Sequence, residues 1–176
     1  MKRTAILSAL LLIAAACAAP VRVAPTIPQG LEPGDDEAMI GTLAAHGVQI
    51  YECRGVNSDD GQQAVWAFVA PEAELFAEGR PVGRHYAGPH WESVDGSRVA
   101  GVVKARAEAP REGAIPWLLL ATRSVGPDGA LAGVTSIQRI NTEGGTAPSA
   151  EGCTLASLGQ RARVAYTADY VLYGAR

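Results

Sequence analysis

Long apolar runs are scarce in this chain of 176 residues, and it has no cluster of basic residues. After the first sixteen residues, the most apolar segment is Ile115–Ala121, which Pro116 interrupts. A membrane-spanning helix needs about 20 apolar residues, so the sequence predicts none in the body of the chain. The net charge of −3, without a basic patch, indicates that nucleic acid is not a partner.

The sequence also lacks the motifs of familiar catalytic and metal sites. It has no G-x-S-x-G nucleophile motif and no C-x-x-C pair, and it contains only three histidines and three cysteines. We therefore expect no cofactor, and the sequence specifies no reaction.

What the chain does contain begins with an export signal. Lys2 and Arg3 form a short cationic head before Ala5–Ala16, which is uncharged and too short to span a bilayer. This pattern predicts a signal peptide over residues 1–16. The run Ala14–Cys17 fits a bacterial lipobox, whereas Ala16–Ala18 fits an A-x-A site of ordinary secretion. We favour lipidation of Cys17, and a secreted soluble protein is the alternative.

Residues 17–34 would then hold the lipid attachment site and a spacer that is rich in proline. The remaining residues, 35–176, are enough for one domain with a proper core. A lipid on Cys17 would tie this domain to the outer face of a membrane in the cell envelope. The membrane is therefore one expected partner.

Cys53 and Cys153 lie 100 positions apart in the body of the chain. Given export, a disulfide between them is the favoured interpretation. A catalytic or metal-binding thiolate pair is the alternative, but neither cysteine has a histidine beside it. We expect the pair to be part of the scaffold.

Short runs of β-branched and aromatic residues alternate with turn residues along the body. Such runs are typical of half-buried strands, and Asp95-Gly96 and Asp128-Gly129 are hairpin signals. The pattern predicts a mainly β, antiparallel sandwich or barrel with short helical turns. The runs are Val48–Cys53, Ala64–Val69, Val99–Ala107, Trp117–Val125, Val134–Asn141, Arg163–Tyr166 and Tyr170–Tyr173.

Two further segments are ambiguous. Glu37–His46 fits either a short helix or a strand, and we favour the strand because its neighbours are strands. Pro71–Ala77 begins with proline and acidic residues, which suits a single helical turn.

Several blocks of the sequence, in one order, resemble a known family. They are Gly47–Cys53, His85–Pro89, Trp91-Glu92, Ala114–Leu120, Gly133–Arg139, Asn141–Gly145, Gly152-Cys153 and Tyr166–Tyr170. The chain resembles, from about Ile27 to Tyr173, the domain-of-unknown-function family 3455 of secreted bacterial and fungal proteins. The resemblance implies one extracytoplasmic β-rich domain with its two cysteines at Cys53 and Cys153. It implies no established activity, cofactor or catalytic residue.

The densest polar block is His85–Asp95. Its donors would suit zinc or copper if His85, His90, Glu92 and Asp95 converged, but residues 85 and 90 of a continuous strand point to opposite faces. A polar turn is the favoured interpretation of the block. A glycosidase-like acid pair, Glu92 and Asp95, is a weaker alternative.

Two features of the sequence point to a ligand surface. Trp91 is the one tryptophan inside a polar block, whereas Trp66 and Trp117 lie in apolar runs that favour the core. Arg139 lies inside a strand-like run, where a structural pair with an acid such as Glu52 is the favoured interpretation and binding of an anionic ligand is the alternative.

We therefore expect a non-enzymatic envelope module that binds an unknown ligand or partner near His85, Trp91, Glu92 and Arg139. One alternative is a metal-dependent or acid/base hydrolytic enzyme that uses the His85–Asp95 block. The other is a structural envelope protein without a small ligand.

Overall fold

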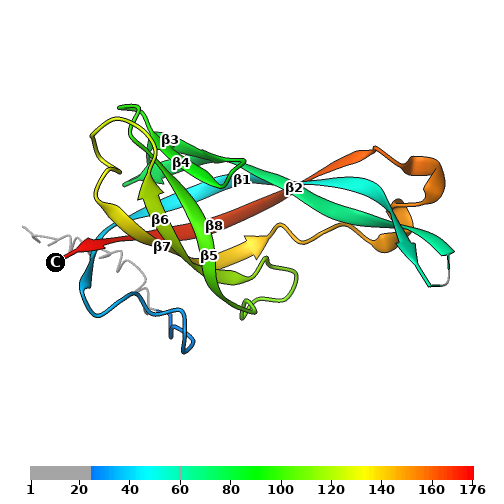
Figure 1. Cartoon of the computed structure of the whole chain (residues 1–176), viewed down its shortest axis with the longest axis horizontal. Helices are drawn as coiled ribbons and strands as arrows, with labels where there is room; N and C mark the ends of the chain where they lie inside the picture. Colours follow the sequence, from blue (N-terminus) through cyan, green and yellow to red (C-terminus); the bar gives the residue numbers. More distant parts are fainter. Residues whose placement is uncertain (1–24, 60) are drawn as a thin grey trace, which may run out of the picture.

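Eight antiparallel strands form a closed barrel in the computed structural model, which describes residues 25–59 and 61–176 (Figure 1). Each strand pairs with the next, and β8 closes the barrel on β1. The strands are β1 (Glu37–Ser58), β2 (Gly61–Ala77), β3 (Arg80–Tyr86), β4 (His90–Ser93), β5 (Arg98–Ala107), β6 (Trp117–Ser124), β7 (Val134–Gly144) and β8 (Arg161–Ala175). The prediction of a mainly β antiparallel domain is confirmed, in its barrel form. The signal peptide expected over residues 1–16 and the lipidation expected at Cys17 lie outside the described residues.

Alternation along the strands directs apolar side chains into the barrel lumen. On β8, Tyr166, Ala168, Tyr170 and Leu172 are buried and belong to one apolar cluster inside the barrel. This strand is continuous, although the sequence indicated two separate runs. The three residues between those runs keep the two-residue period, so the strand passes through them without a break.

The segment Pro71–Ala77 is part of β2, so the helical turn expected there is wrong. Ala73 and Leu75 are buried while Glu72 and Glu74 are exposed, which is the period of a strand. Pairing with both β1 and β3 overrides the helix-start pattern of proline and acids. Glu37–His46 is a strand, as expected.

The connection between β6 and β7 covers one end of the barrel, which we call the closed end, and its Leu131 is buried in the lumen cluster. Asp95 and Ser97, in the predicted hairpin turn between β4 and β5, hold this connection in place. The Asp95 carboxylate accepts hydrogen bonds from Ser97 Oγ at 2.6 Å and from the Ala130 backbone N–H at 2.8 Å. Ser97 Oγ in turn accepts one from the Leu131 N–H at 3.0 Å. These two polar residues therefore serve the closed end.

A second apolar cluster covers the outside of the barrel. Leu31 packs there against Trp117, Ile140 and Val171 from β6, β7 and β8. The Gln138 side chain donates to the Leu31 carbonyl at 2.6 Å. Residues 25–34 thus lie against the barrel, although the sequence assigns them to the spacer. Trp117 is buried in this second cluster, as expected.

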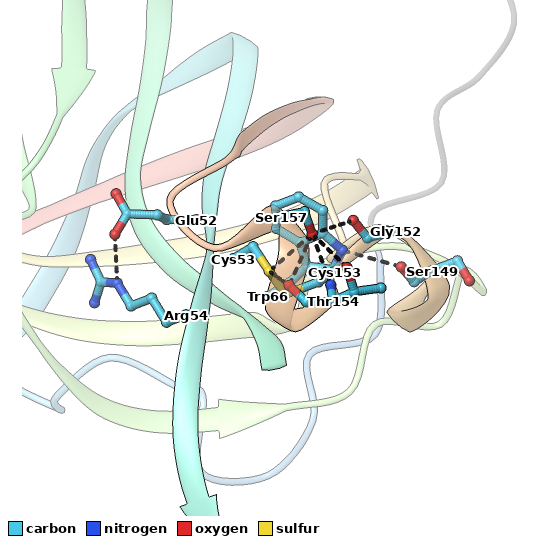
Figure 2. Close-up of a disulfide and its surroundings, with 9 residues drawn as sticks. All are labelled: Glu52, Cys53, Arg54, Trp66, Ser149, Gly152, Cys153, Thr154 and Ser157. Carbon is cyan, nitrogen blue, oxygen red and sulfur yellow. Dashed lines mark hydrogen bonds and ion pairs between the residues drawn. A yellow bond between two sulfur atoms is a disulfide. The ribbon is translucent and has the colours of Figure 1, made fainter. Parts of the chain in front are cut away.

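Beyond the barrel, β1 and β2 continue as a long hairpin arm, with the connection between β7 and β8 beside it (Figure 1). That connection contains two short 3₁₀ helices, η1 (Ala150–Gly152) and η2 (Leu155–Ser157). The disulfide between Cys53 and Cys153, predicted from the sequence, ties it to β1 (Figure 2). Trp66 is half-buried on the arm and donates to the Ser149 carbonyl at 3.1 Å, so it is not a core residue.

Helices of the length and apolarity needed to cross a membrane do not occur in residues 25–59 and 61–176.

Candidate functional site

A cavity of about 330 Å³ occupies the lumen of the barrel. Each of the eight strands contributes to its wall. The strand residues are Gln49 of β1, Phe68, Val69 and Pro71 of β2, His85 of β3, Trp91 of β4, Val103 of β5, Leu118 and Leu120 of β6, Arg139 of β7 and Tyr170 of β8, and Gly88 and Pro89 of the turn after β3 complete the wall. A mostly apolar wall with a few converging polar groups is typical of small-molecule sites.

Three aromatic rings form one side of this cavity. His85 stacks on Trp91 with 4.2 Å between ring centroids, and both rings meet Tyr170 edge-on. Trp91 fits into the barrel because Gly101 faces it: a Cβ on Gly101 would lie 2.8 Å from the indole ring. All three aromatic residues are almost completely buried.

The His85 imidazole is neutral. Its burial lowers the pKa to about 3, and the nearby positive charge of Arg139 acts in the same direction. Nδ1 lies 2.8 Å from the His90 carbonyl oxygen, which can only accept, so Nδ1 carries the proton. Nε2 is then an acceptor, without a partner among the described residues.

Arg139 brings the one positive charge to the cavity wall. Its Nε and Nη2 donate to the Pro116 carbonyl at 3.1 and 2.7 Å, and among the described residues it has no acidic partner. The pairing with Glu52 considered from the sequence is not found, because Glu52 bonds to Arg54 and Arg161 on the surface. The guanidinium is thus held in place but not neutralised.

Two buried hydrogen-bond donors of the same wall have no partner in the described part of the chain. They are Gln49 Nε2 and Trp91 Nε1, in residues that are 2% and 1% exposed. An unpaired buried donor costs about 1–3 kcal/mol, so two in one cavity call for an explanation.

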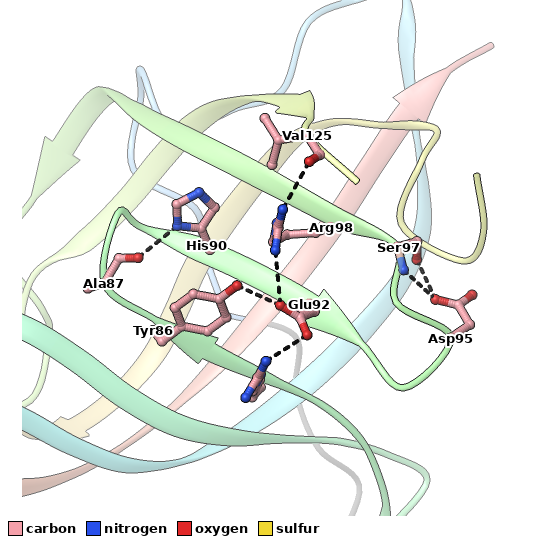
Figure 3. Close-up of polar contacts among 9 residues, drawn as sticks. Tyr86, Ala87, His90, Glu92, Asp95, Ser97, Arg98 and Val125 are labelled. Atoms are coloured by element: carbon pink, nitrogen blue, oxygen red, sulfur yellow. Dashed lines mark hydrogen bonds and ion pairs between the residues drawn. The ribbon is translucent and has the colours of Figure 1, made fainter. Parts of the chain in front are cut away.

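The sequence grouped Glu92 with His85, Trp91 and Arg139, and the structure brings only the last three together. Glu92 follows Trp91 on β4 and points to the outer face of the barrel, where Tyr86 donates to it at 2.6 Å and Arg84 at 2.8 Å (Figure 3). These hydrogen bonds lower the pKa of its carboxyl, with that of Tyr86 the largest cause. Glu92 is part of a surface network.

The set proposed for a metal is dispersed. His85 faces the lumen, His90 lies outside with its Nδ1 2.7 Å from the Ala87 carbonyl, and Asp95 is bonded at the closed end (Figure 3). No group of three potential metal ligands occurs among the described residues. The pair Glu92 and Asp95 is likewise engaged in surface hydrogen bonds.

Sequence reasoning missed Gln49. The strand Val48–Cys53 has two faces, and the one with Gln49, Tyr51 and Cys53 is the buried one. A polar residue on the same face as a tyrosine and a disulfide cysteine was the available signal. Tyr51 lies beside the site and donates to the Gly145 carbonyl at 2.7 Å.

A larger hollow of about 710 Å³ lies on the outer face of β1, β7 and β8. Its charged groups are already paired, because Arg111 forms an ion pair with Glu143, and Asp169 accepts a hydrogen bond from Asn141 at 2.8 Å. We therefore take the lumen as the candidate site.

Comparison with known proteins gives one match. The model of a family described as protein of unknown function (DUF3455) matches residues 33–174. No curated protein and no solved structure matches the chain significantly.

Proposed function

We propose that this chain, which belongs to the DUF3455 family of proteins of unknown function, is an exported binding protein of the cell envelope that holds a small organic molecule in its barrel lumen. Export and a lipid on Cys17 are the cellular part of the proposal. Ligand binding in the lumen is the biochemical part.

The observation that carries the proposal is the combination of space and unsatisfied polar groups in one place. The cavity of about 330 Å³ lies within the size range of small-molecule sites, about 300–1,000 Å³. Its wall contains an arginine without an acidic partner and two unpaired buried donors. A barrel whose lumen served packing alone would be filled by side chains.

Export is supported by the N-terminal pattern and by the disulfide, since disulfides persist mainly in oxidising compartments. Metabolic labelling with a radioactive fatty acid tests the anchor. Label is expected in the wild type and not in Cys17→Ser, and equal labelling of both would contradict lipidation at Cys17.

The lumen is tested with N-phenyl-1-naphthylamine, a neutral aromatic probe whose fluorescence rises in apolar sites. Two adjacent valines of β5 give a matched pair of variants: Val103 lines the cavity, whereas Val102 is 72% exposed and does not. We expect saturable binding that Val103→Trp blocks and Val102→Trp leaves intact. Absence of saturable binding, or equal binding by both variants, would contradict a lumen site and favour a structural envelope protein.

A further inference from the structure

Arg139 differs from the arginines on the surface of the barrel. Among the described residues, seven arginines form ion pairs with carboxylates, and exposed Arg106, Arg123 and Arg176 have only solvent around their charge. The seven are Arg54, Arg80, Arg84, Arg98, Arg111, Arg161 and Arg163. Arg139 faces the lumen, and the thirteen residues that line the cavity include no aspartate or glutamate. Arg139 is half-buried, and a partly desolvated charge without a counter-charge is costly, so a partner from outside the chain would be stabilising.

The groups around this charge are neutral. Burial raises the pKa of Tyr51 and of Tyr170, so both hydroxyls stay protonated, and the His85 imidazole is uncharged. The positive charge of Arg139 acts on each of these three groups. The lumen therefore has a net charge of +1 from its described residues, and it repels a cationic ligand.

The guanidinium is also oriented. Its Nε and Nη2 donate to the Pro116 carbonyl, and its side chain also forms a hydrogen bond with Tyr170. The unpaired donors of Gln49 and Trp91 belong to the same wall. Two donors that lack acceptors, in the same wall as a guanidinium without an acidic partner, match a group rich in acceptor oxygens, and arginine binds carboxylates through charge-assisted hydrogen bonds.

The rest of the wall is apolar. Val69, Pro71, Leu118 and Leu120 surround the space, and Phe68 and Val103 are exposed parts of the same wall. The volume is at the lower end of the range for ligand sites, which suits one ring or a short chain. One guanidinium balances one negative charge, which favours a carboxylate over a phosphate ester with nearly two.

We infer that the lumen binds a small organic monocarboxylate, with its carboxylate on Arg139 and its apolar body against the β2 and β6 side chains. This inference rests on the proposed function, because it names the ligand class of the same cavity.

Competition against N-phenyl-1-naphthylamine tests the ligand class with matched pairs. 4-Phenylbutyrate and 4-phenylbutyramide differ in charge but little in shape. We expect the carboxylate to compete about tenfold more strongly than the amide, as charge-assisted hydrogen bonds imply. Phenylphosphate is expected to compete more weakly than 4-phenylbutyrate.

Arg139→Gln is expected to abolish the preference for the carboxylate while the amide and the probe still bind, which also shows that this variant is folded. Arg123→Gln removes the same charge from an exposed position and should keep the preference. Arg139→Lys retains the charge without the guanidinium fork and should keep part of it. If Arg139→Gln does not fold, this lysine variant and the amide pair decide the question.

The outcomes separate the two proposals. If the probe binds in the lumen but the carboxylate and the amide compete equally, or neither competes, the inference about the ligand class is wrong and the lumen site stands. Tighter competition by phenylphosphate, or an unchanged preference in Arg139→Gln, overturns it too. If the probe itself does not bind the wild type, the proposed function fails.

Discussion

Acidification should destabilise the barrel through His85. The side chain is 3% exposed, and its burial lowers the pKa in the folded state to about 3, against 6.5 for an unperturbed histidine. Below pH 6.5 the unfolded chain binds a proton at this position, whereas the folded chain binds it only near pH 3. The free energy of unfolding therefore falls as the pH drops from 6.5 to 3, and above pH 6.5 the group has no effect.

The magnitude follows from the two pKa values. Proton uptake by the unfolded state lowers the free energy of unfolding by about 2 kcal/mol at pH 5, relative to pH 7.5, and by about 3 kcal/mol at pH 4. Carboxylates also bind protons over this range, so the wild-type profile alone does not isolate the contribution. A comparison with a variant that lacks the imidazole does.

Urea unfolding at pH 7.5, 6, 5 and 4 provides the assay. His85→Asn keeps a donor in the position of Nδ1, and the packing that it loses is the same at every pH. Between pH 7.5 and pH 5, its free energy of unfolding should therefore fall by about 2 kcal/mol less than that of the wild type. His46→Gln, at an exposed position, serves as the control and should retain the wild-type dependence. Parallel profiles for the wild type and His85→Asn would refute the assignment of a buried neutral imidazole.

Three further predictions concern the stability of the structure around the site. Replacing both disulfide cysteines by serine should lower the free energy of unfolding by about 2–5 kcal/mol, because a loop of 100 residues is released. Urea titrations without reducing agent measure this, and an unchanged value would contradict a structural role of the disulfide. Gly101→Ala should lower the free energy of unfolding by about 1–3 kcal/mol and weaken probe binding, because the added Cβ meets Trp91. Gly133→Ala, with open space around it, should be neutral, and equal effects of the two variants would refute the packing argument. Ser97→Ala should lower the free energy of unfolding by about 1–3 kcal/mol and speed amide hydrogen exchange at Leu131, whose N–H loses its acceptor. Unchanged exchange at Leu131 would show that Ser97 does not hold the closed end.

The fold could be predicted to the level of a mainly β sandwich or barrel, because alternation and turn residues report local structure. The choice of a barrel depends on the pairing of β1 with β8, which joins residues more than 100 positions apart, such as Gln49 and Val164. Local patterns carry no information about that pairing. For the same reason Pro71–Ala77 suggested a helix start, although its two neighbouring strands make it a strand.

The candidate site could be predicted in part. Strand parity places Trp91 and Glu92 on opposite faces, so the sequence already contained the reason why Glu92 lies outside. It did not indicate which face was internal. Arg139 was notable as an arginine in a strand, but its lack of an acidic partner depends on neighbours from other strands. The unpaired donors of Gln49 and Trp91 are likewise visible only in three dimensions.

The most direct test of ligand binding in the lumen is a two-dimensional ¹H–¹⁵N NMR titration of the purified protein with 4-phenylbutyrate. The largest chemical-shift changes are expected at the Arg139 Nε–H and at the backbone amides of His85, Trp91 and Tyr170. These four residues come from four different strands. The arm around the disulfide and the surface network around Glu92 should change little. Changes confined to the arm or to the Glu92 network, or no changes at saturating ligand, would contradict a binding site in the lumen.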